Sequence, residues 1–143
     1  MKHVSEKQGR LVLMCAGATN LLGVPLFSQV FSNDTLITLS PEVFSRFGLL
    51  LIMFWGLAYL ASAGIHRQAS GLLAVFALVK LAYVVSWGLW LNDHFLQLPE
   101  LLRTHPLTGA FYAIYGVIDL LFAVLFIRLS LQARQVSMTQ VTS

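Results

Sequence analysis

Four long runs of apolar residues dominate the sequence, at about residues 11–31, 43–64, 71–91 and 107–128. A helix needs about 20 apolar residues to cross the hydrocarbon core of a bilayer, which is close to the length of each run. Runs such as GLLLIMFWGLAYLA are apolar on every side, whereas the strands of a membrane barrel alternate between apolar and polar residues. Because lipid offers the backbone no hydrogen-bond partners, the runs must be helical. The sequence therefore predicts an all-α, integral membrane four-helix transmembrane bundle.

The overall composition excludes an ordinary soluble fold. Hydrophobic residues make up 57% of the 143 residues and charged residues 10%, whereas soluble domains carry about 25% charged residues. The segments between the runs are short connectors, so we expect a single transmembrane domain over residues 1–143. From Ser130 onward the chain is polar and lacks an apolar stripe, which predicts a disordered cytoplasmic tail over about residues 130–143.

The basic residues indicate how the chain is oriented, because short loops rich in Lys and Arg stay in the cytoplasm. Most of them fall on one side of the predicted spans: Lys2, Lys7, Arg10, Arg67, Arg128 and Arg134. Both termini are therefore expected to be cytoplasmic. Topology and attraction to anionic lipid headgroups explain the net charge of +3. No basic stripe with interleaved aromatic residues supports a nucleic-acid partner, so the lipid bilayer is the expected partner.

Two opposite charges interrupt the predicted spans at matching depth. Lys80 lies in FALVKLAYV and Asp119 in YGVIDLLFAVLF, each about nine residues from the cytoplasmic end of its run. At about 1.5 Å per residue both are near the bilayer midplane, too deep for Lys80 to reach water fully. Each charge alone would disfavour insertion by roughly 2.5–3.5 kcal/mol. We expect the two side chains to face each other or to share a hydrated pocket.

Polar and aromatic residues of the other runs come to a similar level. Counting along the runs brings Asn20 and the segment from Trp55 to Tyr59 near the depth of Lys80, and helical phase puts further aromatic residues on the faces of both charges. The inner halves of these faces are apolar, which predicts a pocket open to the outside. Its candidate residues for a ligand or an ion are Lys80, Asp119, Asn20, Tyr59, Tyr83, Tyr112, Tyr115, Trp55 and Trp87.

Each of these features also has a structural interpretation. A buried pair of Lys80 and Asp119 can fix the register of the helices, and Asn20 can serve as a hydrogen-bonding residue between helices. The tyrosines and tryptophans can pack in the core or anchor the chain at the membrane interface. The residue types alone therefore leave a structural and a functional role open.

Signatures of enzymes and cofactors are missing from the sequence. The histidines, His3, His66, His94 and His105, fall in tails or loops, so no pair is positioned to ligate a haem, and no His/Cys cluster has metal-site spacing. Cys15 is the only cysteine, which excludes an internal disulfide, and we expect it to be buried. The sequence predicts no cofactor and no metal, and it favours a non-enzymatic role.

Three segments carry a resemblance to a known family: RFGLLLIMFWGLAYL, ALVKLAYV and YGVIDLLFAVLF. With its lysine in the third run and its aspartate in the fourth, the chain resembles the small four-helix bacterial membrane proteins of unknown function that are broadly DoxX-like. The resemblance covers nearly the whole chain through loose motifs, and it makes Lys80 and Asp119 the defining polar residues. It implies a four-helix bundle in the bacterial inner membrane and no settled activity.

Three hypotheses for the function follow from these features. The first is a small multi-pass assembly or interaction subunit, held together by the Lys80–Asp119 pair, with a membrane-protein partner or a second copy of itself. The second is a small transporter, or an ion- or proton-coupled solute-binding protein, that uses Asp119 and Lys80 in an outward-facing pocket. The third is an enzyme acting on a lipid or quinone headgroup at the membrane surface through Asp93, His94 and His105.

Overall fold

The computed structural model describes residues 4–141, with side chains described as far as residue 135, and within this part the chain forms helices and no strand. The all-helical prediction is thus confirmed. In chain order the helices are α1 (Glu6–Phe27), α2 (Asp34–Leu39), α3 (Pro41–Phe44), α4 (Arg46–Ser62), α5 (Ser70–His94), the 3-10 helix η1 (Phe95–Gln97), α6 (Leu98–Thr104) and α7 (Pro106–Val141).

Among the described residues, three helical segments are long and apolar enough to cross a membrane: Glu6–Phe27, Ser70–Thr104 and Pro106–Gln135. They mark the chain as a membrane protein. The apolar helix α4, with 17 residues, is shorter. The predicted run at residues 43–64 is interrupted at Ser45, which is extended and whose hydroxyl accepts the backbone N–H of Gly48 to cap α4.

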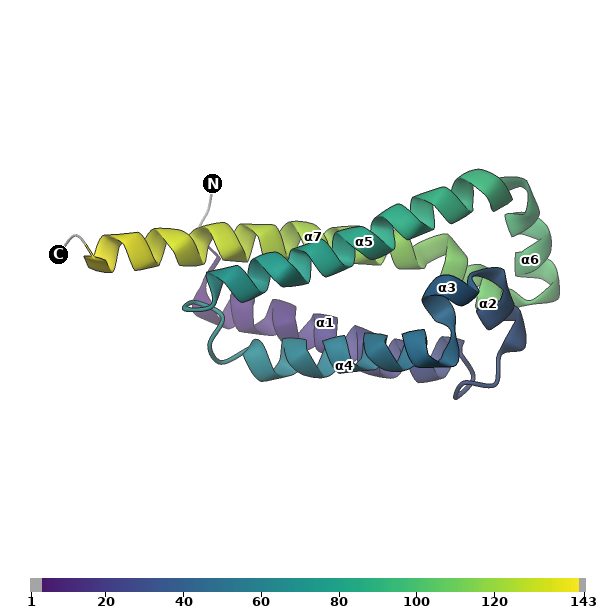
Figure 1. Ribbon diagram of the computed structural model, residues 1–143, viewed down its shortest axis with the longest axis horizontal. Helices are drawn as coiled ribbons and strands as arrows, with labels where there is room; N and C mark the ends of the chain where they lie inside the picture. The colour runs from purple at the N-terminus through teal and green to yellow at the C-terminus, as the bar shows by residue number, and fades with distance from the viewer. Residues whose placement is uncertain (1–3, 142–143) are drawn as a thin grey trace.

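The long helices are arranged as two pairs, α1 with α4 and α5 with α7 (Figure 1). Contacts between α1 and α7 join the pairs. Helix α5 runs away from α4 toward the end of the molecule where α2, α3 and α6 lie (Figure 1). The start of α1 and the C-terminal part of α7 lie together at the opposite end (Figure 1).

Glycines bring α1 and α4 close together. A Cβ atom at Gly17 would lie 2.8 Å from the carbonyl oxygen of Gly56, and a Cβ atom at Gly56 would lie 3.0 Å from Cβ of Asn20. Small residues permit such backbone approach between membrane helices. The close approach places Asn20 directly against the backbone of α4.

The first predicted span, residues 11–31, ends earlier than expected, because α1 stops at Phe27. The next residues, Gln29, Val30 and Phe31, have left-handed backbone φ angles of 49°, 55° and 66°, a conformation that is sterically unfavourable for a β-branched residue such as Val30. Hydrogen bonds hold the turn: the Val30 N–H donates to the Pro25 carbonyl, and the Phe31 N–H to the hydroxyl of Ser28.

The sequence predicts a disordered tail from Ser130, whereas in the structure α7 continues as a helix over residues 130–141; residues 142–143 lie outside the described part. Tertiary contacts explain the difference. The Ser130 hydroxyl donates to the carbonyl of Ser70 at 2.8 Å, and the Gln132 side chain exchanges two hydrogen bonds with the backbone of Val4. The polar composition of the tail could not predict these contacts, because their partners lie far away in the chain.

Two buried clusters lie on either side of the intramembrane charges. The first, beside α4 and the N-terminal half of α5, is built around Leu13, Tyr59, Phe76, Phe122 and Phe126. The second, near α2 and α3, is built around Leu36, Phe44, Leu49, Trp90, Tyr112 and Tyr115. Cys15, expected to be buried, is exposed instead, because it lies on the outer face of α1.

Candidate functional site

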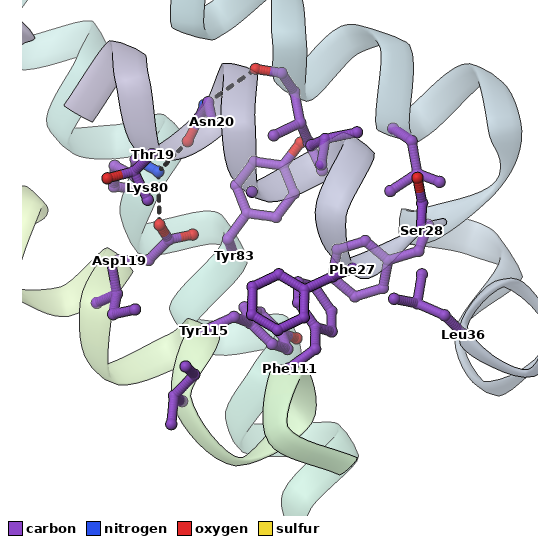
Figure 2. A pocket seen from close by; sticks show the side chains of 17 residues that line it. Thr19, Asn20, Phe27, Ser28, Leu36, Lys80, Tyr83, Phe111, Tyr115 and Asp119 are labelled. Carbon is purple, nitrogen blue, oxygen red and sulfur yellow. Dashed lines mark hydrogen bonds and ion pairs between the residues drawn. The ribbon is translucent and has the colours of Figure 1, made fainter. Parts of the chain in front are cut away.

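A chain of polar contacts connects all four long helices. Lys80 Nζ on α5 lies 2.5 Å from Oδ1 of Asp119 on α7 and donates to Oδ1 of Asn20 on α1 at 3.1 Å. The Asn20 amide in turn donates to the carbonyl of Ile52 on α4 at 2.9 Å (Figure 2). Lys80 and Asp119 thus face each other as the sequence predicts. Together with Asn20 they are called here the polar network.

The Lys80 side chain is enclosed, with 3% of its surface exposed, whereas Asp119 keeps 13%. Besides its two oxygen partners, the ammonium lies 5.7 Å from the ring centroids of Tyr59 and Phe122. Aromatic faces at this distance attract a cation. The environment of Lys80 therefore compensates the positive charge from several directions, as burial in a membrane requires.

Beside the polar network lies a cavity of about 80 Å³ between the two helix pairs (Figure 2). Lys80, Asp119 and Asn20 form one end of it, with Tyr83 nearby (Figure 2). Most of the remaining lining is apolar: Val24, Phe27, Leu36, Phe44, Leu49, Ile52, Phe111, Ile114 and Ile118. The cavity thus combines a charged end with an apolar body.

Aromatic rings form a rigid part of its wall. The rings of Phe111 and Tyr115 are stacked with centroids 4.8 Å apart, and Phe44 meets both edge-on at 5.0 and 5.2 Å. Phe27 extends the group from α1, with its ring 5.4 Å from that of Phe111 (Figure 2). Interlocked rings of this kind cannot turn independently, so the cavity exists before any ligand binds.

Five of the residues predicted for the pocket line this cavity: Lys80, Asp119, Asn20, Tyr83 and Tyr115. The other four lie elsewhere, for identifiable reasons. The Tyr112 hydroxyl donates to the carbonyl of Leu36, and the Trp87 indole N–H donates to the carbonyl of Tyr112 at 2.8 Å. Trp55 and Tyr59 pack against Phe76 in the first cluster.

Sequence reasoning missed several lining residues. Thr19 and Gly23 on α1 are small residues whose type does not indicate a binding site. Phe111 cannot be told apart from the other apolar residues of its run by sequence alone. Ser28, Leu36 and Phe44 reach the cavity only because α1 ends early and the following segment folds back over it. The one available signal was helical phase, since Phe111 lies four residues before Tyr115 and eight before Asp119.

The residues of the surface-enzyme hypothesis make local contacts. The His94 ring stacks on Trp90 with centroids 4.7 Å apart, and Asp93 accepts a hydrogen bond from the neighbouring Asn92. His105 is exposed between α6 and α7. Over the described residues, no group of three or more His, Cys, Asp or Glu side chains could hold a metal ion. These contacts lend the surface-enzyme hypothesis no support.

No family model matches the chain, and no curated protein or solved structure is significantly similar to it. The functional argument therefore depends on the polar network and the cavity.

Asn20 supplies the contact by which the polar network reaches the α1–α4 pair, so its replacement tests the linkage. We expect Asn20→Leu to lower the free energy of unfolding by about 1–3 kcal/mol, because a buried donor of Lys80 loses its partner. Denaturant titration in detergent micelles measures this. The matched control is Thr19→Val, since the Thr19 hydroxyl donates to the carbonyl of Cys15 in its own helix. This variant should change the free energy of unfolding by less than about 0.5 kcal/mol. Equal effects of both variants would contradict a linking role for Asn20.

Proposed function

We propose that the chain crosses the bacterial inner membrane four times, with both termini in the cytoplasm. The 17 residues of α4 extend about 25 Å as a helix, within the range of short membrane spans. Support also comes from the packing of α4 along α1 and from the contact of Asn20 with Ile52 at the level of Lys80. The basic residues Lys7, Arg10, Arg67 and Arg134 would then lie on the cytoplasmic side.

For its function, we propose a membrane-embedded binding protein that holds a small ligand in the cavity, as a carrier or transporter would. One observation carries the proposal: Asp119 and Lys80, although mostly buried, both line the cavity. Charged residues within membrane spans that face a cavity are characteristic of substrate pathways. A pair needed only for helix register would be expected to be packed on all sides.

The chemistry of the polar network suits ligand binding. The Lys80 ammonium has three N–H donors, of which one meets Asn20 and one Asp119. The Asp119 carboxylate has a second oxygen beside the one that accepts from Lys80 (Figure 2). The cavity of about 80 Å³ has room for a few water molecules or for part of a slender organic molecule.

A second candidate is the assembly or interaction subunit, acting with a membrane-protein partner or as a homo-oligomer. The observation that favours it is that the polar network joins all four long helices, so the charges have a use in the fold itself. The likeness to DoxX-like proteins remains a proposal that fits either candidate. A double-mutant cycle on Lys80 and Asp119 measures how far the charges serve the fold.

Filling the cavity tests the binding function. Gly23 lines the cavity, and a Cβ atom added there would meet no atom within 4 Å. We expect Gly23→Leu to leave the fold intact, because the space around Gly23 is open. The added side chain takes space from a bound molecule, so the amount of small molecules that co-purify with the protein should fall roughly tenfold, equivalent to about 1.4 kcal/mol of binding free energy. Mass spectrometry of solvent extracts of the purified protein measures the loss.

The matched control is Gly88→Leu on α5. Gly88 also has open space around its would-be Cβ atom but does not line the cavity, so this variant should retain everything that the unmodified protein binds. Identical extracts from the unmodified protein and both variants would contradict the proposed function.

A further inference from the structure

The cavity is closed at its far end and open at its side. Away from the polar network it is covered by Ser28, Leu36 and Phe44, which are at most 1% exposed. These residues come from the end of α1 and from α2 and α3. A ligand cannot reach the cavity through this cover without displacing fully buried side chains.

The open side lies between α1 and α7. Four cavity-lining residues border it, Thr19 and Gly23 on α1 and Ile114 and Ile118 on α7. Thr19 is exposed, Ile114 is 43% exposed, and the other two are half-buried. Residues that both line a cavity and reach the surface mark its mouth.

This mouth lies at the depth of the polar network, since Thr19 precedes Asn20 and Ile118 precedes Asp119. Both positions are in the middle of long apolar helices. Around the mouth the surface is apolar, with Leu22 on α1 72% exposed and Val117 on α7 56% exposed. In a bilayer the mouth therefore faces acyl chains rather than water.

The polar network restricts the charge and the hydrogen-bonding groups that the polar head of a ligand arriving by this route can have. Lys80 and Asp119 already balance each other's charge at 2.5 Å, so an anion or a cation would have to compete with the existing pair. A neutral hydroxyl group meets both: it can donate to the Asp119 carboxylate and accept from the ammonium of Lys80. The rings of Phe27, Phe111 and Tyr115 offer an apolar surface for the rest of the molecule.

We infer that the ligand is a membrane-dissolved amphiphile with a neutral hydroxyl head, which passes from the bilayer between α1 and α7 and places its hydroxyl on the polar network. The inference rests on the proposed binding function of the cavity and adds the route and the chemical class. It also defines two variants of equal chemistry on α7. Ile114→Trp narrows the mouth, whereas Val117→Trp, on the exposed face outside the cavity lining, does not.

The probe for the test is a long-chain primary alcohol with a diazirine in its chain, added to the full-length protein in phosphatidylcholine vesicles. Its methyl ether, which has no donor, is the matched probe. After photolysis, mass spectrometry identifies the labelled residues. We expect saturable labelling of the cavity-lining segments of α1 and α7, which unlabelled alcohol should displace. Labelling by the ether should be roughly tenfold weaker, the change expected for the loss of one charge-assisted hydrogen bond. Ile114→Trp should slow the labelling and Val117→Trp should not.

Equal labelling by both probes, spread over lipid-facing residues and insensitive to Ile114→Trp, would overturn the inference. If Gly23→Leu nevertheless removes a co-purifying molecule, the binding function stands and only the route and the class fail. If Gly23→Leu removes nothing and the alcohol does not label the cavity, the binding function fails as well.

Discussion

Replacing Lys80 by methionine is expected to lower the free energy of unfolding by about 3–5 kcal/mol, because removal of one member of a buried ion pair leaves the other without compensation. Asp119→Asn should act in the same direction, since Lys80 keeps Asn20 as an acceptor but loses its counter-charge. Reversible unfolding of the purified protein by SDS in mixed micelles measures both variants. Their helical content before unfolding shows whether they fold.

The double variant decides what the loss means. If the charges are mainly structural, Lys80→Met combined with Asp119→Asn should lose less than the sum of the single losses, with a coupling of about 2 kcal/mol. A parallel cycle on Arg46 and Asp34, an ion pair 3.6 Å apart with both side chains mostly exposed, should give a coupling of about 0–1 kcal/mol. Stable single variants without coupling would refute a structural role and leave ligand binding as the reason for the charges.

Gly116→Ala is expected to lower the free energy of unfolding by about 1–3 kcal/mol, although alanine is normally the better helix former. A Cβ atom at Gly116 would overlap the indole ring of Trp87. The ring would have to move, and its N–H would lose the carbonyl of Tyr112. Thermal unfolding monitored by circular dichroism in detergent measures the effect.

Two further variants isolate the cause. Gly88→Ala, on the helix of Trp87 but in open space, should be neutral or slightly stabilising. In a Trp87→Leu background the added methyl group of Gly116→Ala has no indole to displace, so most of its cost should vanish. A full loss of stability in that background would show that the Trp87 contact is not the reason for the glycine.

What the sequence predicted correctly depended on depth and charge. Lys80 and Asp119 could be paired because opposite charges in lipid have few other solutions, and Asn20 followed from its level in the first run. These are properties of single helices, counted along the chain.

What the sequence could not provide depended on how the helices pair. Trp55 and Tyr59 lie near the level of Lys80, yet their rings belong to the first cluster, where both pack against Phe76 of α5. The left-handed turn from Gln29 to Phe31 contains no glycine or asparagine, the residues that would indicate such a turn in the sequence. That turn folds α2 and α3 over the cavity, so the hydrophobic periodicity of the sequence could not predict which residues form the far wall of the cavity.

The pairing of the helices also bears on how the chain is made. Both charges belong to the α5–α7 pair, while the α1–α4 pair contributes only the neutral Asn20. Lys80 leaves the ribosome 39 residues before Asp119, which at about 5–20 residues per second corresponds to roughly 2–8 s. During that interval Lys80 lacks the carboxylate of Asp119, with which it pairs in the folded protein. Because an unpaired lysine disfavours insertion by roughly 2.5–3.5 kcal/mol, we expect the arrival of α7 to stabilise α5 in the bilayer, which favours insertion of the two helices as a hairpin.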